Sequence, residues 1–111
     1  MIVRLYTGAD GQSHFEDLTL PAPGVEESPL QAAKGINFRR QPPGLFIDWH
    51  PAPRRQWVIT LSGVGEIGLG DGTVRRFGPG DAMLAEDLTG KGHTTRVVGN
   101  QPRISMTVPL A

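Results

Sequence analysis

Hydrophobic and polar residues alternate along short stretches of this chain, and that alternation predicts β-strands rather than helices. In residues 56–61, for example, Gln56, Val58 and Thr60 would face one side of a sheet and the residues between them the other. Glycine, proline or aspartate interrupts each stretch after a few residues, which is typical of tightly connected strands. The pattern predicts about eight to ten strands, drawn from residues 2–7, 13–20, 36–40, 45–50, 56–61, 64–69, 73–77, 82–86, 93–98 and 103–110.

One segment carries the start and stop signals of a short helix. Ser28 suits the N-cap, Pro29 the first helical position and Gln31 the capping box, and Gly35 suits the position after the last turn. A helix this short is not stable on its own. We therefore expect either a turn or two of helix packed on the body of the protein, or an ordered loop.

Alternation also orients a group of candidate site residues. In residues 45–50, strict alternation places Phe46, Asp48 and His50 on the face opposite Trp49. A tryptophan on the outside of a barrel implies that the other face, with His50, points inward.

The same argument applies to two later strands. Gln56 lies opposite Trp57, and His93 opens its strand on the face of Thr95. We therefore expect Gln56 and His93 to reach the same cavity as His50.

Short strands at regular spacing, without a convincing long helix, predict an all-β sandwich or barrel. The length of 111 residues fits one domain, residues 1–111. Within it, residues 1–44 would supply N-terminal strands and a loop, and residues 45–111 the barrel itself.

Composition narrows the environment and the partners. Eleven basic and eleven acidic residues give a formal net charge of zero, which argues against binding to nucleic acid or to an anionic membrane surface. Without cysteine there is no disulfide or thiolate chemistry. The N-terminus lacks the apolar core of a signal peptide, and no apolar run is long enough to cross a bilayer. We expect a cytoplasmic protein.

Charged residues near strand ends have a simple interpretation. The arginine pairs at residues 39–40, 54–55 and 75–76 are predicted to be surface groups and ion-pair partners, with an anion site as the alternative. Glu86 and Asp87 precede a glycine-rich segment and are interpreted as polar loop residues, with a role as acids of a lid as the alternative.

The stretch from His50 to His93 resembles the two sequence motifs of the cupin superfamily, which are small double-stranded β-helix or jelly-roll barrels. The first motif has two histidines one residue apart, a glutamate and a glycine, and its positions are occupied here by His50, Ala52, Gln56 and Gly63. The second motif has a Pro-x-Gly-type turn and a histidine, which residues 77–81 and His93 match. The resemblance implies a cupin-like barrel.

The resemblance also implies a metal site with altered ligands. Typical cupin sites combine imidazoles with one carboxylate, a set that suits Fe, Mn, Ni or Zn. Here the metal ligands would be His50, His93 and the oxygen of Gln56, with Asp48 as the alternative carboxylate. Ala52 cannot bind a metal, and an amide brings no charge to offset the cation. A metal-free site, with these side chains hydrogen-bonded to one another or to water, is therefore favoured.

Three hypotheses for function follow, and the sequence leaves open whether the protein is an enzyme. The first is a barrel that binds a small polar molecule in a pocket lined by Phe46, His50, Gln56, Val58, His93 and Thr95. The second is a minimal metal-dependent oxygenase or isomerase in which His50 and His93 hold the metal. The third is a metal-free enzyme in which one of these histidines transfers a proton.

A homodimer is also expected. Trp49 and Trp57 would project from the outside of the barrel, where a partner subunit could cover them. The first strand also needs an edge with which to pair. The resemblance implies the same, since small cupins are often dimers.

Overall fold

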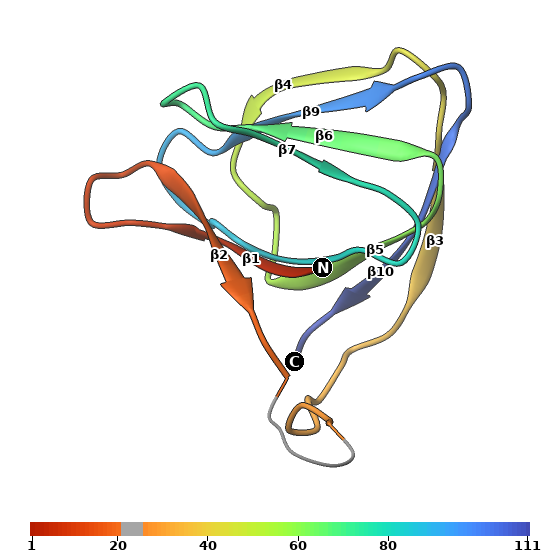
Figure 1. The fold of residues 1–111 in the computed structure, drawn as a ribbon. Coiled ribbons are helices and arrows are strands. Elements are labelled where there is room, and N and C mark those ends of the chain that lie inside the picture. Colours follow the sequence, from red (N-terminus) through yellow and green to blue (C-terminus); the bar gives the residue numbers. More distant parts are fainter. Residues whose placement is uncertain (21–25) are drawn as a thin grey trace.

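The computed structural model describes residues 1–20 and 26–111, and this part of the chain folds into ten β-strands without an α-helix (Figure 1). Each of the ten predicted segments coincides with one strand to within two residues at either end, so that prediction is confirmed. No helix in the described part is long and apolar enough to cross a membrane. The strands are β1 (Ile2–Thr7), β2 (Ser13–Leu18), β3 (Asn37–Gln41), β4 (Phe46–His50), β5 (Gln56–Ser62), β6 (Val64–Gly68), β7 (Val74–Phe77), β8 (Ala82–Glu86), β9 (His93–Val98) and β10 (Arg103–Pro109).

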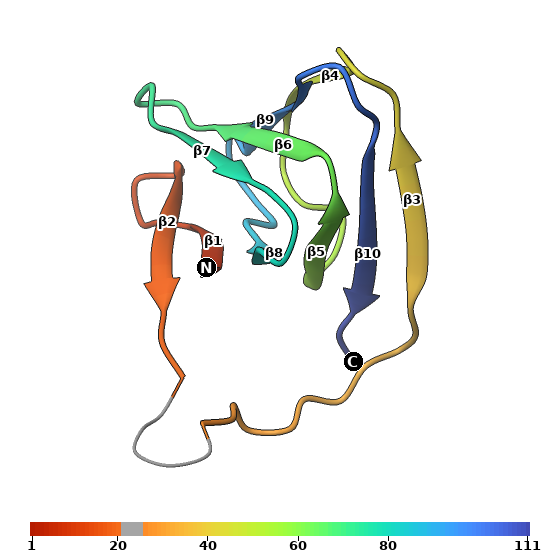
Figure 2. The same ribbon diagram turned by 45° about the vertical axis from the view of Figure 1, so that its right-hand side comes forward.

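The strands form two sheets that face each other (Figure 2). The larger sheet has six strands in the order β2-β1-β8-β5-β10-β3, and the smaller has four in the order β4-β9-β6-β7. Neighbouring strands are antiparallel except for β1 and β8, which run parallel. β1 therefore lies inside the larger sheet, and the N-terminal segment is part of the barrel wall.

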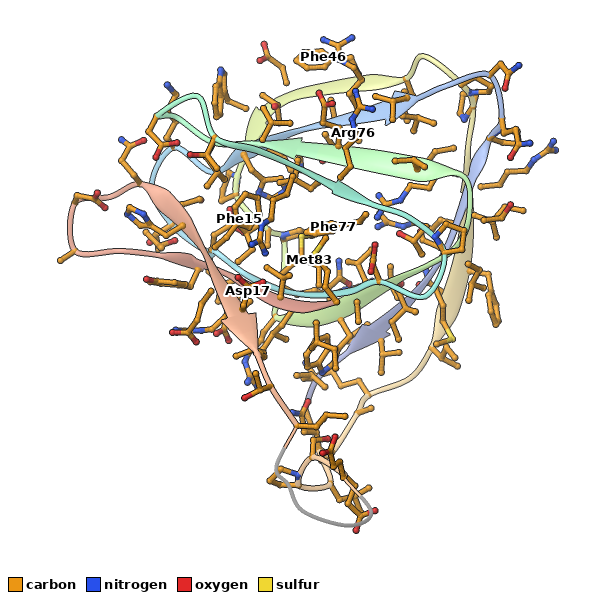
Figure 3. The ribbon with its side chains drawn as sticks, in the orientation of Figure 1. Phe15, Asp17, Phe46, Arg76, Phe77 and Met83 are labelled. Carbon is orange, nitrogen blue, oxygen red and sulfur yellow. The ribbon has the colours of Figure 1, made fainter. Side chains whose placement is uncertain are left out.

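Apolar side chains from both sheets pack together between them. Val3 and Leu5 of β1 are fully buried, and Phe77 of β7 is 1% exposed. The ring of Phe15 in β2 meets that of Phe77 edge to face, with 6.2 Å between centroids (Figure 3). This aromatic contact joins the edge strands of the two sheets and closes the barrel on that side.

An ion pair covers the same aromatic contact. Arg75 of β7 donates two hydrogen bonds to the carboxylate of Asp17 in β2, at 2.7 and 2.9 Å. The guanidinium of Arg75 holds the pKa of Asp17 below its usual value. Arg75 and Arg76 both pair with acids, as predicted for this arginine pair.

Strict alternation fails in β4, and the predicted position of Phe46 is wrong as a result. The register between β4 and β9 shifts between Ile47 and His50, which is a β-bulge. Ile47 and His50 both line the interior, whereas Phe46 is 45% exposed. Its ring lies outside the barrel, under the guanidinium of Arg96 (Figure 3).

The candidate helix at Ser28–Gly35 is absent, and the ordered-loop alternative is confirmed. The backbone of this segment pairs instead with the end of β10: Lys34 donates to the carbonyl of Pro109, and Ala33 forms a β-bridge with Leu110. A short helix has little stability of its own, so pairing with an existing strand is preferred. Gln31 also accepts a hydrogen bond of 2.7 Å from the indole of Trp57.

We predict that Phe77→Ala lowers the free energy of unfolding by about 3–5 kcal/mol, because it removes a fully buried ring and its contact with Phe15. Urea unfolding followed by circular dichroism measures this change. Val74→Ala on the same strand, where the side chain is 51% exposed, is the control and should change stability by less than about 0.5 kcal/mol. Equal effects of the two changes would contradict the proposed closure.

The homodimer stays a prediction, and the outer face of the larger sheet offers a place for it. Met106 of β10 lies between Ile59 of β5 and Phe38 of β3 in the sheet register, and Phe38 is 66% exposed. Light scattering should give twice the chain mass of 12.0 kDa, and Phe38→Asp should shift the mass towards the monomer. Phe46→Asp, on the outside of the smaller sheet, should leave the dimer intact. A wild-type monomer mass would contradict the prediction.

Candidate functional site

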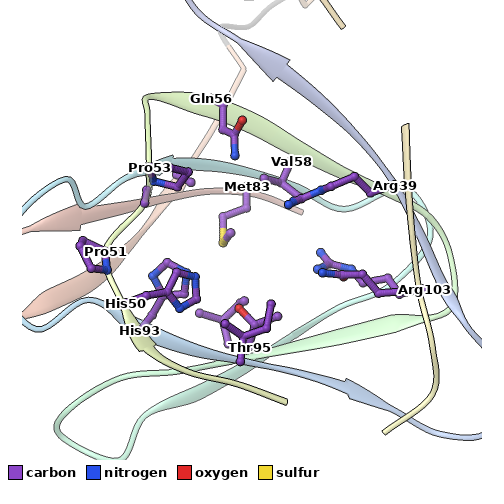
Figure 4. Close-up of a pocket in the computed structure, with 15 residues that line it drawn as sticks. Arg39, His50, Pro51, Pro53, Gln56, Val58, Met83, His93, Thr95 and Arg103 are labelled. Atoms are coloured by element: carbon purple, nitrogen blue, oxygen red, sulfur yellow. The ribbon is translucent and has the colours of Figure 1, made fainter. Parts of the chain in front are cut away.

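A cavity of about 320 Å³ lies between the sheets. Side chains from both sheets line it, and Figure 4 shows the imidazoles at one side and two arginines at the other. Its lining consists of Arg39, Gln41, Ile47, His50, Pro51, Ala52, Pro53, Gln56, Val58, Ile67, Met83, Ala85, His93, Thr95 and Arg103.

The structure brings His50 and His93 together in this lining. The two residues are partners across β4 and β9, and their ring centroids lie 4.6 Å apart with the planes tilted by 54°. The Nδ1 atom of His50 is 2.8 Å from the backbone carbonyl of Asp48. The bulge in β4 makes this arrangement possible, because it turns His50 inward beside His93.

Asp87 fixes the orientation of His93. Its carboxylate is fully buried, and one oxygen is 2.7 Å from Nδ1 of His93 and accepts a 2.7 Å hydrogen bond from Ser13. A carboxylate only accepts hydrogen bonds, so Nδ1 of His93 carries the proton. In the neutral form of the ring, Nε2 then carries the lone pair, which can accept a hydrogen bond or a proton.

The interpretation of Asp87 as a polar loop residue is therefore wrong. Asp87 follows β8 on the same alternating face as Met83 and Ala85, both of which line the cavity. That alternation was a signal in the sequence. Glu86 points the other way, where burial opposes its ionisation but the guanidinium groups of Arg4 and Arg55 prevail and lower its pKa.

Gln56 lines the cavity but its oxygen is already engaged. The side chain is 4% exposed, and Oε1 accepts a hydrogen bond of 2.9 Å from Nε of Arg54. In this orientation the amide presents its NH₂ group as the remaining donor. Val58 and Thr95 line the cavity beside it.

Asp48 lies outside the cavity. It occupies the bulge of β4, is exposed, and accepts a 2.8 Å hydrogen bond from the backbone N–H of Trp49. Of the residues proposed as a site from the sequence, the structure therefore gathers His50, Gln56, Val58, His93 and Thr95, and leaves out Phe46 and Asp48.

The side chains at the cavity do not fit a typical metal centre. Among residues 1–20 and 26–111, no group of three or more histidine, cysteine, aspartate or glutamate side chains could hold a metal ion. Two imidazoles form an incomplete ligand set for Fe, Mn, Ni or Zn. Arg39 and Arg103 line the same cavity and would repel a divalent cation.

Arg103 is a site residue that sequence reasoning missed. It is 2% exposed, and its Nε and Nη2 atoms donate to the hydroxyl of Thr60 at 3.3 and 2.9 Å. Burial and the nearby Arg39 lower the pKa of Arg103 to about 10. The available signal was its alternation with Ser105 and Thr107, since all three share the inward face of β10.

Arg39 stands beside Arg103 in the cavity wall. Burial, with a contribution from the charge of Arg54, lowers the pKa of Arg39. Both residues of the pair at 39–40 are exposed, as predicted. Arg39 in addition lines the cavity, whereas Arg40 does not. Alternation separates the two side chains to opposite faces of β3.

Comparison with known proteins identifies the fold. No protein-family model and no curated protein matches this chain. It is similar to the structure of SPY1581, a conserved protein of unknown function from Streptococcus pyogenes, with 22% identity over 74% of this chain and 68% of that one and a TM-score of 0.54. It is also similar to an uncharacterized conserved protein with a double-stranded β-helix domain from Klebsiella pneumoniae subsp. pneumoniae, with 24% identity over 81% and 80% of the two chains and a TM-score of 0.54.

The fold is therefore an all-β, cupin-like double-stranded β-helix, and the fold predicted from the sequence is confirmed. Identities this low carry the fold and no activity.

We predict that the protein binds divalent metal weakly and loses it on dialysis against a chelator, because the cavity lining offers two imidazoles and no carboxylate to complete the ligand set. Mass spectrometry of the dialysed protein for iron, manganese, nickel and zinc checks this. The double variant His50→Ala, His93→Ala is the control for metal bound elsewhere. One equivalent of metal that survives dialysis in the wild type and disappears in the double variant would contradict the prediction.

Proposed function

We propose that this protein binds a small polar molecule in the cavity between its sheets. The observation that supports this most strongly is the cavity itself, into which polar side chains from both sheets converge. Its volume of about 320 Å³ is at the lower end of the range for small-molecule sites. A small ligand, rather than a large cofactor, fits it best.

The apolar and the polar side chains of the lining would contribute to binding in different ways. Val58, Ile67 and Met83 form an apolar wall from both sheets, which would displace water from the ligand. The NH₂ group of Gln56 and the Nε2 atom of His93 would set its orientation through hydrogen bonds. The carboxylate of Asp87 holds the ring of His93 in position through its hydrogen bond with Nδ1.

Catalysis by the histidines is the alternative. A metal-dependent oxygenase or isomerase built on His50 and His93 would require that metal bound by these two histidines survives dialysis. Proton transfer without a metal has a specific observation in its favour, because the Asp87–His93 pair leaves Nε2 of His93 as the proton acceptor. Both alternatives use the same cavity, and a cytoplasmic location stays a prediction for all three.

Nuclear magnetic resonance with a panel of small polar molecules tests the proposal. Sugars, amides, amines and carboxylates are titrated separately into ¹⁵N-labelled protein. We expect at least one class to shift the amide resonances of cavity residues such as Val58 and Thr95, and to leave those of Phe46 and Trp49 unchanged.

Two variants test whether the shifts of the amide resonances come from binding in the cavity. Ala85→Met extends a lining side chain into the cavity and should abolish the shifts, whereas Leu61→Met on the outer face of β5 should preserve them. Shifts confined to exterior residues, or retained in full by Ala85→Met, would contradict binding in the cavity. Both variants are checked for folding by circular dichroism.

A further inference from the structure

One side of the cavity carries positive charge that the protein does not neutralise. Arg39 and Arg103 line it, and none of the fifteen lining residues is an aspartate or glutamate. Among the residues that the structure describes, the ion pairs involve other arginines, namely Arg4, Arg55, Arg75 and Arg76. The buried acid Asp87 contacts His93 and Ser13, and no ion pair in the described part of the chain involves Arg39 or Arg103.

The guanidinium of Arg103 is held in a fixed position. Thr60 accepts its Nε and Nη2 hydrogen bonds, which uses part of its set of N–H donors. The other face of the group packs on Gly65 of β6, where an added Cβ would lie 2.5–2.7 Å from Cζ, Nε and Nη1. Only glycine at residue 65 leaves room for Arg103 in this position. Residues of both sheets, Thr60 and Gly65, therefore fix where its guanidinium lies.

A buried cation without a counter-charge is costly to the folded protein. The lowered pKa of Arg103 has the same origin, since burial and Arg39 both disfavour its charged form. An anion that entered the cavity would offset this cost and complete the donor set. The free-energy cost of burying the guanidinium of Arg103 therefore favours a ligand that carries negative charge.

We propose that the molecule bound in this cavity is a small carboxylic acid, whose carboxylate is held by Arg103 with help from Arg39. A guanidinium matches a carboxylate in shape and can bind both oxygens at once. This assignment rests on the proposed function and names its ligand class.

A second group of the cavity indicates what else the acid carries. Gln41 lies opposite Arg103 in the register of β3 and β10, is 9% exposed, and its buried Oε1 atom has no hydrogen-bond partner in the described structure. An acceptor left alone beside the carboxylate site suits a ligand hydroxyl. The structure therefore favours a hydroxy acid over an unsubstituted acid.

Titrations with closely matched probes test the ligand class. Lactate, propionate, lactamide and inorganic phosphate are each added to ¹⁵N-labelled protein, and dissociation constants are taken from the shifts of cavity amides. We expect lactate to bind more tightly than propionate, which lacks the hydroxyl. Lactamide, which lacks the charge, should bind at least about tenfold more weakly than lactate, as for the loss of a charge-assisted hydrogen bond.

Substitutions of the two arginines test whether these residues bind the carboxylate. Arg103→Met should weaken lactate binding about 10- to 100-fold while thermal stability is kept or raised, because the uncompensated charge is gone. A purely structural role for Arg103 would instead lower the melting temperature. If Arg103→Met does not fold, Arg39→Met at the other arginine carries the test. Arg40→Met, next to it on the opposite face of β3, is the matched control and should bind lactate like the wild type.

Several outcomes would overturn the assignment. They are equal binding of lactate and lactamide, tighter binding of phosphate than of lactate, or unchanged lactate affinity in Arg39→Met and in folded Arg103→Met. If sugars, amides or amines shift the cavity amides and lactate does not, the ligand class is wrong and the proposed function stands. If no molecule of the panel shifts them, both are wrong.

Discussion

The buried carboxylate of Asp87 joins the parts of the chain that surround the cavity. Its side chain contacts Ser13 at the start of β2 and His93 at the start of β9, and its backbone carbonyl accepts a hydrogen bond from Ala52 between β4 and β5. Ser13 belongs to the larger sheet and His93 to the smaller one, and Ala52 lies in the connection between the two sheets. The cavity can stay open at this end because a hydrogen-bonded acid, rather than packed apolar side chains, connects its walls.

The position of His50 depends on the backbone next to this acid. Gly92 immediately precedes β9 with a φ of +77°, and a Cβ there would overlap the backbone carbonyl of His50. The close approach lets β4 and β9 pair at His50 and His93 although the register between them shifts. Glycine at this position is thus a requirement of the histidine pair, because any larger residue would push the two strands apart.

The sequence predicted the strands well because alternation and turn residues are local signals. β5 and β9 keep strict alternation, so Gln56 and His93 lie on the inward face as expected. The bulge in β4 depends on pairing with β9, a contact distant in sequence, and the position of Phe46 was wrong for that reason. Arg103 was missed because a buried arginine runs against the ordinary preference of charged side chains for water.

β10 shows why a polar interior matters for function. Its inward residues are Arg103, Ser105 and Thr107, while its apolar residues Ile104, Met106 and Val108 face outward. The hydroxyls of Ser105 and Thr107 are buried without a hydrogen-bond partner in the described structure, so this inward face lowers stability. Apolar residues there would give a more stable barrel. Of the three inward residues, Arg103 lines the cavity, and its buried charge is best explained by what the barrel contains, since departures from ordinary packing are expected at functional sites.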